Sequence, residues 1–159
     1  MSKSDDEIDR AFQEACRALS FRSLSKKEIE EKLKGLGCKD DSIRTTLEQL
    51  LCLGYINDLD LGETIARSMA ERGYGPLRAQ QKLWERGLDR DCAHNIVEEV
   101  YRNIDLVEMA TYCAARREQR ILHKPIMKRK LAIARHLAGR GFSMECVRMA
   151  LEEIYGNEP

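Results

Sequence analysis

A run of basic side chains near the end of the chain is the feature best suited to binding chemistry. Between Thr111 and Arg140 there are nine basic residues and a single acidic residue, Glu118. Surplus positive charge binds anions, and charge alone does not distinguish the phosphates of a nucleic acid from an acidic protein surface. The predicted contact residues in this run are Arg116, Arg117, Arg120, Lys124, Lys128, Arg129, Lys130 and Arg135.

A smaller basic set lies in the middle of the chain. It comprises Arg72, Arg78 and Arg86, with Lys82 between the last two. For either set the simplest alternative is a helix face exposed to solvent. We favour a contact role for the later run because acidic partners are scarce there. Of the nearby aromatic residues, Tyr74 could stack on a base, whereas we expect Trp84 to fill a core or a turn.

Signals for catalysis, metal binding or a cofactor are weak. The six cysteines include no C-x-x-C pair, and only three histidines occur, so we expect neither a zinc site nor a metal. Cysteines within helical patterns, including Cys52, are expected to pack as small apolar side chains. Gly73-x-Gly75 is followed by proline rather than by G-K-[ST], so it is not a phosphate-binding loop. We expect no enzyme activity and no cofactor.

The composition predicts a folded helical protein. The 159 residues are 43% hydrophobic and 34% charged, which is too apolar for general disorder. Lys+Arg and Asp+Glu both number 27, but residues 1–110 carry 17 basic and 22 acidic side chains, whereas residues 111–159 carry 10 and 5. The start of the chain is acidic and no apolar run approaches the roughly 18 residues of a membrane span. We therefore expect a cytoplasmic protein without membrane contact.

The chain repeats itself at an offset of 50 residues and then of 54 residues. Several aligned positions follow the i, i+4, i+7 spacing of one helix face, which indicates an array of similar helical units. The aligned sets are Leu33, Leu83 and Leu137; Gly37, Gly87 and Gly141; Ile43, Ala93 and Val147; Leu47, Val97 and Leu151; Leu50, Val100 and Ile154; and Ile29, Ala79 and Ile133.

Each unit is predicted to contain two helices, a glycine turn and a third helix. Ser4-x-x-Glu7 is expected to cap the first helix, and Ser25-x-x-Glu28 forms a capping box for the second. Asp40 or Asp41 starts the third helix. In the second unit Asn57-Asp58 supplies a cap, Pro76 takes the first position of the middle helix, and Asp89 opens the next one.

The third unit carries most of the basic run. Its first helix is expected to begin near Asp105 and to continue to about His123, with Lys124-Pro125 starting the second and Ser143 capping the third. The four extra residues of the larger offset are expected in the first helix or the turn after it. In the second helix, Lys128, Arg129 and Arg135 are expected to avoid the inward face, which is assigned to Met127, Leu131, Ala134 and Leu137.

Several motifs in this order resemble the RecX family of regulatory proteins over roughly residues 8–156. They are Ser25-x-x-Glu28-x-x-x-Lys32-Leu33, Gly54-Tyr55-Ile56-Asn57-Asp58, Arg72-Gly73-Tyr74-Gly75-Pro76, Lys82-Leu83-x-x-Arg86-Gly87-Leu88 and Arg140-Gly141-Phe142. The chain departs from the family at Leu61-Gly62, where the family has an aromatic residue and an alanine, and at Gly139-Arg140, where the family has two arginines.

The resemblance implies an all-α protein built from three tandem three-helix repeats, which we expect to form an elongated, curved array. The expected repeats are residues 1–56, 57–103 and the basic 104–159. It also implies a non-enzymatic modulator that binds the RecA-type recombinase filament on single-stranded DNA and inhibits filament growth, ATPase and strand exchange in recombination and repair. We expect a monomer, with possible direct contact to nucleic acid.

The alternatives are a sequence-independent DNA-binding protein and a generic helical scaffold for another protein. A helix–turn–helix DNA reader is disfavoured because Asp40, Asp41 and Glu48 would lie on its recognition helix.

Overall fold

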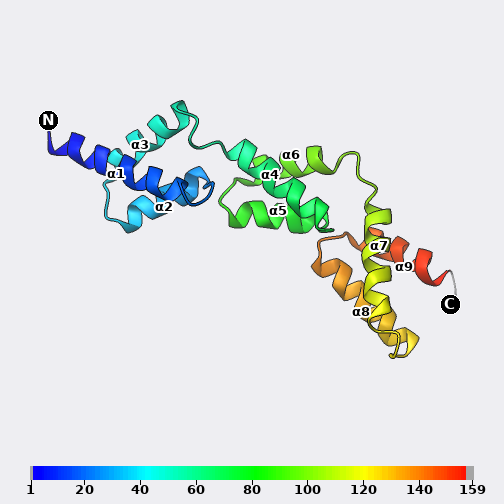
Figure 1. Ribbon diagram of the computed structural model, residues 1–159. Coiled ribbons are helices and arrows are strands. Elements are labelled where there is room, and N and C mark those ends of the chain that lie inside the picture. The colour runs from blue at the N-terminus through cyan, green and yellow to red at the C-terminus, as the bar shows by residue number, and fades with distance from the viewer. Residues whose placement is uncertain (1, 157–159) are drawn as a thin grey trace. The chain divides into compact units, whose positions relative to one another are not determined.

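The chain is all-helical in the computed structural model, which describes residues 2–156. Within that range there are nine α-helices and no strand, as the sequence predicts. The helices, labelled in Figure 1, are α1 (Lys3–Leu19), α2 (Lys26–Gly35), α3 (Asp40–Cys52), α4 (Asp58–Glu71), α5 (Pro76–Glu85), α6 (Arg90–Tyr101), α7 (Leu106–Gln119), α8 (Ile126–Gly139) and α9 (Met144–Tyr155). They form three successive three-helix repeats.

The contacts of the chain divide it into two compact units. Unit 1 comprises Met1–Thr64 and Leu83–Ala93, and unit 2 comprises Ile65–Lys82 and His94–Pro159. The middle repeat, α4–α6, therefore contributes residues to both units. No helix within residues 2–156 has both the length and the apolar character needed to cross a bilayer.

The core of unit 1 forms between α1, α2 and α3. The Ser25–Glu28 capping box that starts α2 is confirmed. The predicted cap of α1 is wrong: Ser2 is the cap and pairs with Asp5, because the helix begins at Lys3, before Ser4. The buried apolar side chains of this core are Ala11, Ala15, Leu24, Ile29, Leu33, Ile43, Leu47, Leu50 and Ile56.

The core of unit 2 lies between α7, α8 and α9. Asp105 and Ser143 cap α7 and α9 as predicted. However, α7 ends at Gln119 rather than near His123. The extra length lies only partly where it was expected, because the first helix is no longer than α4 and most of the addition is in α8, which has 14 residues where α2 and α5 each have 10. The turn of residues 120–125 is also two residues longer than the turn of residues 72–75 in the preceding repeat.

The aligned positions of the repeat share the same environment. Leu33, Leu83 and Leu137 are each fully buried. The same holds for the aligned residues Ile29, Ala79 and Ile133. Truncating any of these leucines to alanine would cost about 2–5 kcal/mol. The aligned glycines Gly37, Gly87 and Gly141 all have positive φ, which L side chains adopt at a cost, so glycine recurs where each second helix ends.

Within unit 1, the residues that follow α5 pack against the start of α2; we call this contact joint A. Arg86 Nε donates to Glu28 Oε1 at 2.8 Å, and Arg86 Nη2 donates to the carbonyl oxygen of Ser23 at 2.9 Å. A Cβ atom on Gly87 would lie 2.9 Å from Cβ of Lys27, so the close approach of the two segments requires glycine.

Within unit 2, the residues that follow α8 pack against the start of α5; we call this contact joint B. The carbonyl oxygen of Arg140 accepts a hydrogen bond from Gly75 N–H at 2.7 Å, and that of Gly141 accepts from Leu77 N–H at 3.1 Å. Leu77 N–H belongs to the first turn of α5, where amides have no partner inside the helix. Arg140 and Gly141 align with Arg86 and Gly87 at the offset of 54, so the two joints use equivalent positions.

Candidate functional site

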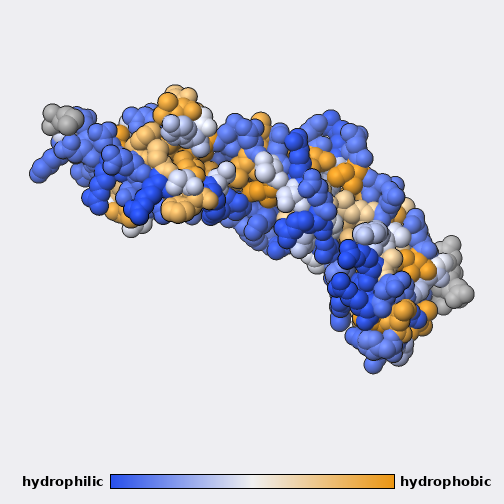
Figure 2. All heavy atoms as spheres, viewed as in Figure 1, coloured by the Kyte–Doolittle hydropathy of each residue, from blue (hydrophilic) through white to orange (hydrophobic). Residues whose placement is uncertain are grey.

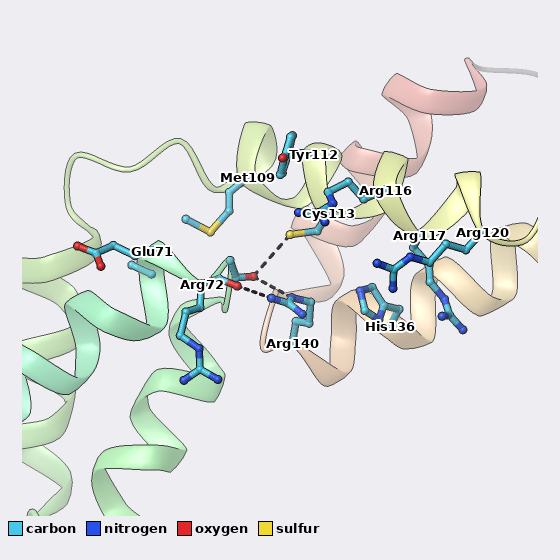
Figure 3. Close-up of a pocket in the computed structure, with 12 residues that line it drawn as sticks. Glu71, Arg72, Met109, Tyr112, Cys113, Arg116, Arg117, Arg120, His136 and Arg140 are labelled. Carbon is cyan, nitrogen blue, oxygen red and sulfur yellow. Dashed lines mark hydrogen bonds between the residues drawn. The ribbon is translucent and has the colours of Figure 1, made fainter.

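A basic pocket of about 550 Å³ lies in unit 2, between the end of α4 and one side of α7 and α8 (Figure 3). Figure 2 shows strongly hydrophilic side chains gathered over α7 and α8. Five arginines and a histidine line the pocket, and Glu71 is the one carboxylate among the lining residues. The complete lining is Ala70, Glu71, Arg72, Gly73, Met109, Tyr112, Cys113, Arg116, Arg117, Arg120, His136 and Arg140.

The packing of α7 directs its arginines into this pocket. Ala110 and Ala114 are fully buried and turn one face of the helix toward the core. Arg117 lies three residues after Ala114, and Arg120 three residues later, so both follow helical spacing along the neighbouring side. Small residues on the inward face let α7 pack closely while the long side chains reach outward. The sequence-based prediction that Arg116 and Arg120 lie away from these two alanines agrees with this arrangement.

Arg140 is held by the end of α4 and has a structural role. Its Nε donates to the carbonyl oxygen of Gly73 at 3.0 Å, and its Nη2 donates to that of Arg72. The guanidinium also lies 4.4 Å from the ring centroid of Tyr74. A cation at the C-terminal end of a helix is favourable because the carbonyl groups there carry partial negative charge. These bonds appear as dashed lines in Figure 3.

The charges of Arg116, Arg117 and Arg120 are not neutralised by carboxylates within residues 2–156. In the described part of the chain none of the three forms an ion pair with a carboxylate. Nε of Arg117 is buried and has no hydrogen-bond partner there.

The positive potential of the pocket also acts on His136. Burial lowers the pKa of His136 below its ordinary value of 6.5, and the charges of Arg140, Arg117 and Arg120 lower it further. Each of these factors disfavours the protonated ring. The histidine is therefore neutral near pH 7, and the arginines supply the charge of the pocket.

Two predicted contact residues lie instead in ion pairs inside the protein. Arg129 Nη1 donates to Glu118 Oε1 at 2.8 Å, with both side chains largely buried. Arg86 pairs with Glu28 in joint A, and both of these side chains are also largely buried. Sequence reasoning missed both pairs because their acceptors lie on other helices. These two arginines hold the fold together, and we leave them out of the proposed contact surface.

The other predicted residues lie around the pocket or on the outer side of α8. Arg72 is exposed at the pocket, with its guanidinium 5.3 Å from the Tyr74 ring centroid. Lys130 is half-buried and lies 5.2 Å from the Tyr155 ring centroid. Arg78 is half-buried beside Gly141 in joint B. The remaining members, Lys124, Lys128 and Arg135, are exposed.

The predicted inward face of α8 is partly wrong. Ile133 and Leu137 are fully buried, but Met127 and Leu131 are exposed. The extra residues of α8 carry Met127 beyond the part of the helix that the core covers. Two further expectations fail at the surface: Cys52 is exposed, and so is Trp84, whose ring lies 4.8 Å from the guanidinium of Arg90.

Sequence reasoning also missed His136 and Cys113 as pocket residues. Cys113 Sγ donates weakly to the carbonyl oxygen of Gly73 at 3.6 Å. The four-residue spacing of His136 and Arg140 on one helix was the available signal. It placed the two side chains on one face but did not reveal that this face meets the end of α4.

Comparisons with known proteins point to one family over nearly the whole chain. The family model "RecX, first three-helix domain" matches residues 11–50. Regulatory protein RecX of Prosthecochloris aestuarii is 30% identical over 97% of this chain and 99% of its own length, and that of Legionella pneumophila is 27% identical over 92% and 96%. The crystal structure of RecX from Lactobacillus salivarius superposes with a TM-score of 0.79 at 26% identity, covering 94% of this chain and 97% of that one.

Proposed function

Because the chain belongs to the RecX family of regulatory proteins, we propose that it binds a RecA-type recombinase filament on single-stranded DNA and restrains filament growth, ATP turnover and strand exchange. The arginine pocket of unit 2 is the observation that carries this proposal. It gathers positive charge that the fold itself does not neutralise, and a filament on DNA presents both phosphates and acidic protein surfaces.

Regulation by such a protein follows from binding alone. A ligand shifts an equilibrium between two filament geometries only as far as it binds one of them more tightly. A protein of several repeats that contacts more than one recombinase subunit would favour one geometry and oppose the changes that accompany growth and turnover. The proposal needs no catalytic residue, cofactor or metal.

The contact residues divide by position. Arg116, Arg117 and Arg120, with Arg72 at the rim, form the proposed pocket contact. The exposed Lys124, Lys128 and Arg135 supply further charge on α8. We assign the long-range, salt-dependent attraction to the exposed lysines and arginine and the specific hydrogen bonds to the pocket group, because several guanidinium groups converge there and one of them, Arg117, is half-buried.

The decisive experiment compares pocket and non-pocket charges of equal number. Arg117→Gln/Arg120→Gln removes two pocket cations, and Arg17→Gln/Lys32→Gln removes two exposed cations of unit 1 as the control. With recombinase ATPase on single-stranded DNA as readout, we expect the pocket variant to need roughly tenfold or more protein for half-inhibition. The control should match the wild type. Equal potency of all three proteins, with unchanged circular dichroism, would exclude the pocket as the contact.

A second candidate function is sequence-independent binding of single-stranded DNA without a recombinase. The cluster of arginines in the pocket favours it, since guanidinium groups form charge-assisted hydrogen bonds with phosphate oxygens. Fluorescence anisotropy of a labelled oligonucleotide, without recombinase, tests it across a salt series. Each neutralised phosphate should contribute about −0.7 to the log–log slope. Binding tight enough to account for all inhibition would favour this function, and no binding at physiological salt would favour the recombinase.

A further inference from the structure

Within residues 2–156, the first and the third repeat each carry one half of a joint like A and B without the other half packed against it. In joints A and B, the turn after the second helix of one repeat packs against the start of the second helix of the preceding repeat. The first repeat has the same turn, and a Cβ atom on its Gly37 would meet no atom within 4 Å. The third repeat has the same helix start, where Leu122, Ile126 and Met127 are exposed. Each of these two free surfaces lies within one unit.

The free turn of the first repeat is Leu36-Gly37. A Cβ atom on Gly37 would meet no atom within 4 Å, whereas those on Gly87 and Gly141 would collide with the neighbouring repeat. Leu36 stands where the other repeats have arginine, and 50% of it is exposed. Within residues 2–156, no backbone N–H donates to the carbonyl oxygen of either residue. Those two oxygens correspond to the acceptors that Arg140 and Gly141 use in joint B.

The surroundings of this free turn are acidic. A cavity of about 420 Å³ beside Gly37 is lined by three carboxylates and two cations: Asp6, Glu7 and Glu14 from α1, with Arg10 and Lys39. The C-terminal end of α2 adds partial negative charge from its last carbonyl groups. The surface therefore combines one exposed apolar side chain, two free acceptors and a negative rim.

The free helix start of the third repeat is the beginning of α8 with the turn before it. Leu122, Ile126 and Met127 are exposed there, and 71% of Met127 is accessible. Pro125 precedes the helix and provides no side-chain cap. Lys124 and Lys128 lie among these apolar residues, and residues 119–144 contain no Asp or Glu. The surface thus offers apolar contact, amide donors of a helix N-terminus and positive charge.

We propose that the Leu36-Gly37 turn of one copy of this protein packs against the start of α8 of a second copy, in a head-to-tail contact of the kind that the two internal joints make. The two surfaces are complementary in charge, in apolar exposure and in backbone hydrogen bonding. Leu36 would contact Met127 of the neighbouring copy, and the carboxylates of α1 would face Lys124 and Lys128. This revises the monomer expected from the sequence.

Such a contact is weak and open-ended. It pairs different surfaces of the two copies, so each added copy presents a new free end and the assembly does not close on itself by symmetry alone. The internal joints involve few residues, and interfaces of small area are transient. We expect a dissociation constant of roughly 0.1–1 mM.

Two variants that each introduce one charge are designed to block one surface each. Leu36→Lys places a cation opposite Lys124 and Lys128, and Met127→Glu places an anion opposite Asp6 and Glu14. The matched controls are Leu59→Lys and Met144→Glu, because Leu59 is 53% exposed and Met144 is 74% exposed. None of the four side chains is buried, so all four proteins should fold. Sedimentation velocity from about 10 µM to about 1 mM covers the expected range.

The average mass of the wild type and of both controls should rise with concentration, while each blocked variant alone stays monomeric. An equimolar mixture of the two blocked variants should form dimers but nothing larger, because one intact end of each kind remains. The inference is overturned if the wild type stays monomeric throughout, if the blocked variants associate like the wild type, or if their mixture does not dimerise. None of these readouts involves a recombinase, so the proposed function is tested separately.

Discussion

Joints A and B occupy equivalent positions and are held by different chemistry. In joint A the side chain of Arg86 binds the carboxylate of Glu28. In joint B the side chain of Arg140 donates hydrogen bonds to carbonyl oxygens and lies over the Tyr74 ring, and two backbone hydrogen bonds from Gly75 and Leu77 join the segments directly. Joint A is therefore an ion pair with a close approach at one glycine, and joint B is a main-chain contact.

The difference follows from two substitutions between the repeats. Position 28 is glutamate, and its counterpart 50 residues later is Arg78, so an ion pair of the joint A type has no carboxylate in unit 2. Ser25 is replaced by Gly75, whose missing side chain lets the backbone of Gly141 approach. The loss of the glutamate also leaves Arg140 without a neutralising carboxylate. The positive charge of the pocket is thus partly a consequence of how joint B is built.

Replacing the glycine of each joint with alanine is expected to give the largest difference in unfolding free energy between the joints. Gly141→Ala would put Cβ 2.2 Å from the backbone nitrogen of Arg78, which cannot move aside cheaply, and we expect a loss of about 4 kcal/mol in unfolding free energy. Gly87→Ala meets Cβ of Lys27 at 2.9 Å and should cost less. Gly37→Ala has open space and pays only for its positive φ, about 1–2 kcal/mol. Urea denaturation measures all three, and an equal loss in each would contradict the close approach in joint B.

The second-largest effect comes from removing the arginines. Arg86→Met removes the closer partner of the largely buried Glu28 and leaves only the exposed Arg22, 3.4 Å from Oε1, as an ion-pair partner, so we expect a loss of about 2–3 kcal/mol. Arg140→Met leaves carbonyl groups at a helix end, which water can reach, and should cost about 1 kcal/mol. Adding Glu28→Gln to Arg86→Met should recover part of its loss, because glutamine keeps the capping bond to Ser25 N–H and carries no charge. No recovery in thermal or urea unfolding would show that the charge of Glu28 is not the cause.

The sequence predicted the parts of this fold that depend on neighbours along the chain. The period of apolar residues located the buried columns, and Ser25, Asp105 and Ser143 marked helix starts because capping acts over three residues. The end of α7 was misplaced because neither glycine nor proline follows Gln119 directly. Local patterns also suffice to bring Arg116, Arg117 and Arg120 to one region of a helix surface.

The joints and the outline of the pocket could not be predicted in this way. Arg86 and Glu28 are 58 residues apart, and Arg140 and Gly73 are 67 apart, so their pairing depends on how successive repeats pack. A basic residue that binds a partner and one that binds a distant carboxylate have the same sequence signature. Exposure was equally ambiguous at Met127, where an apolar residue at helical spacing lies beyond the end of the core.

The third prediction uses pH to separate the joints. Burial alone would raise the pKa of Glu28, but hydrogen bonds from Arg86 and from Ser25 N–H outweigh it, so the pKa lies below the ordinary value of 4.5. A depressed pKa in the folded state stabilises the protein above the unfolded pKa, and this contribution is lost as the pH falls through the folded value. The difference in unfolding free energy between the wild type and Arg86→Met should therefore become smaller below about pH 4.5. The difference in unfolding free energy between the wild type and Arg140→Met should stay constant over the same pH range, because joint B contains no carboxylate. Parallel pH profiles for the two variants would contradict the assignment of Glu28 to joint A.

The smallest effect is a change in the titration of His136, and it tests whether the charge left over by joint B is available to a ligand. Burial and the cations of Arg140, Arg117 and Arg120 lower its pKa, so an anion that binds beside these arginines should raise it again. We expect an upward shift of a few tenths of a unit in the NMR titration when inorganic phosphate or a short oligonucleotide is added. In Arg117→Gln/Arg120→Gln the pKa of His136 should begin higher and respond less to the anion, because two of the cations that lower it are gone. If neither the anion nor the double substitution changes the pKa of His136, the guanidinium groups are already neutralised by solvent ions. The pocket would then bind a partner no better than an ordinary exposed basic helix face.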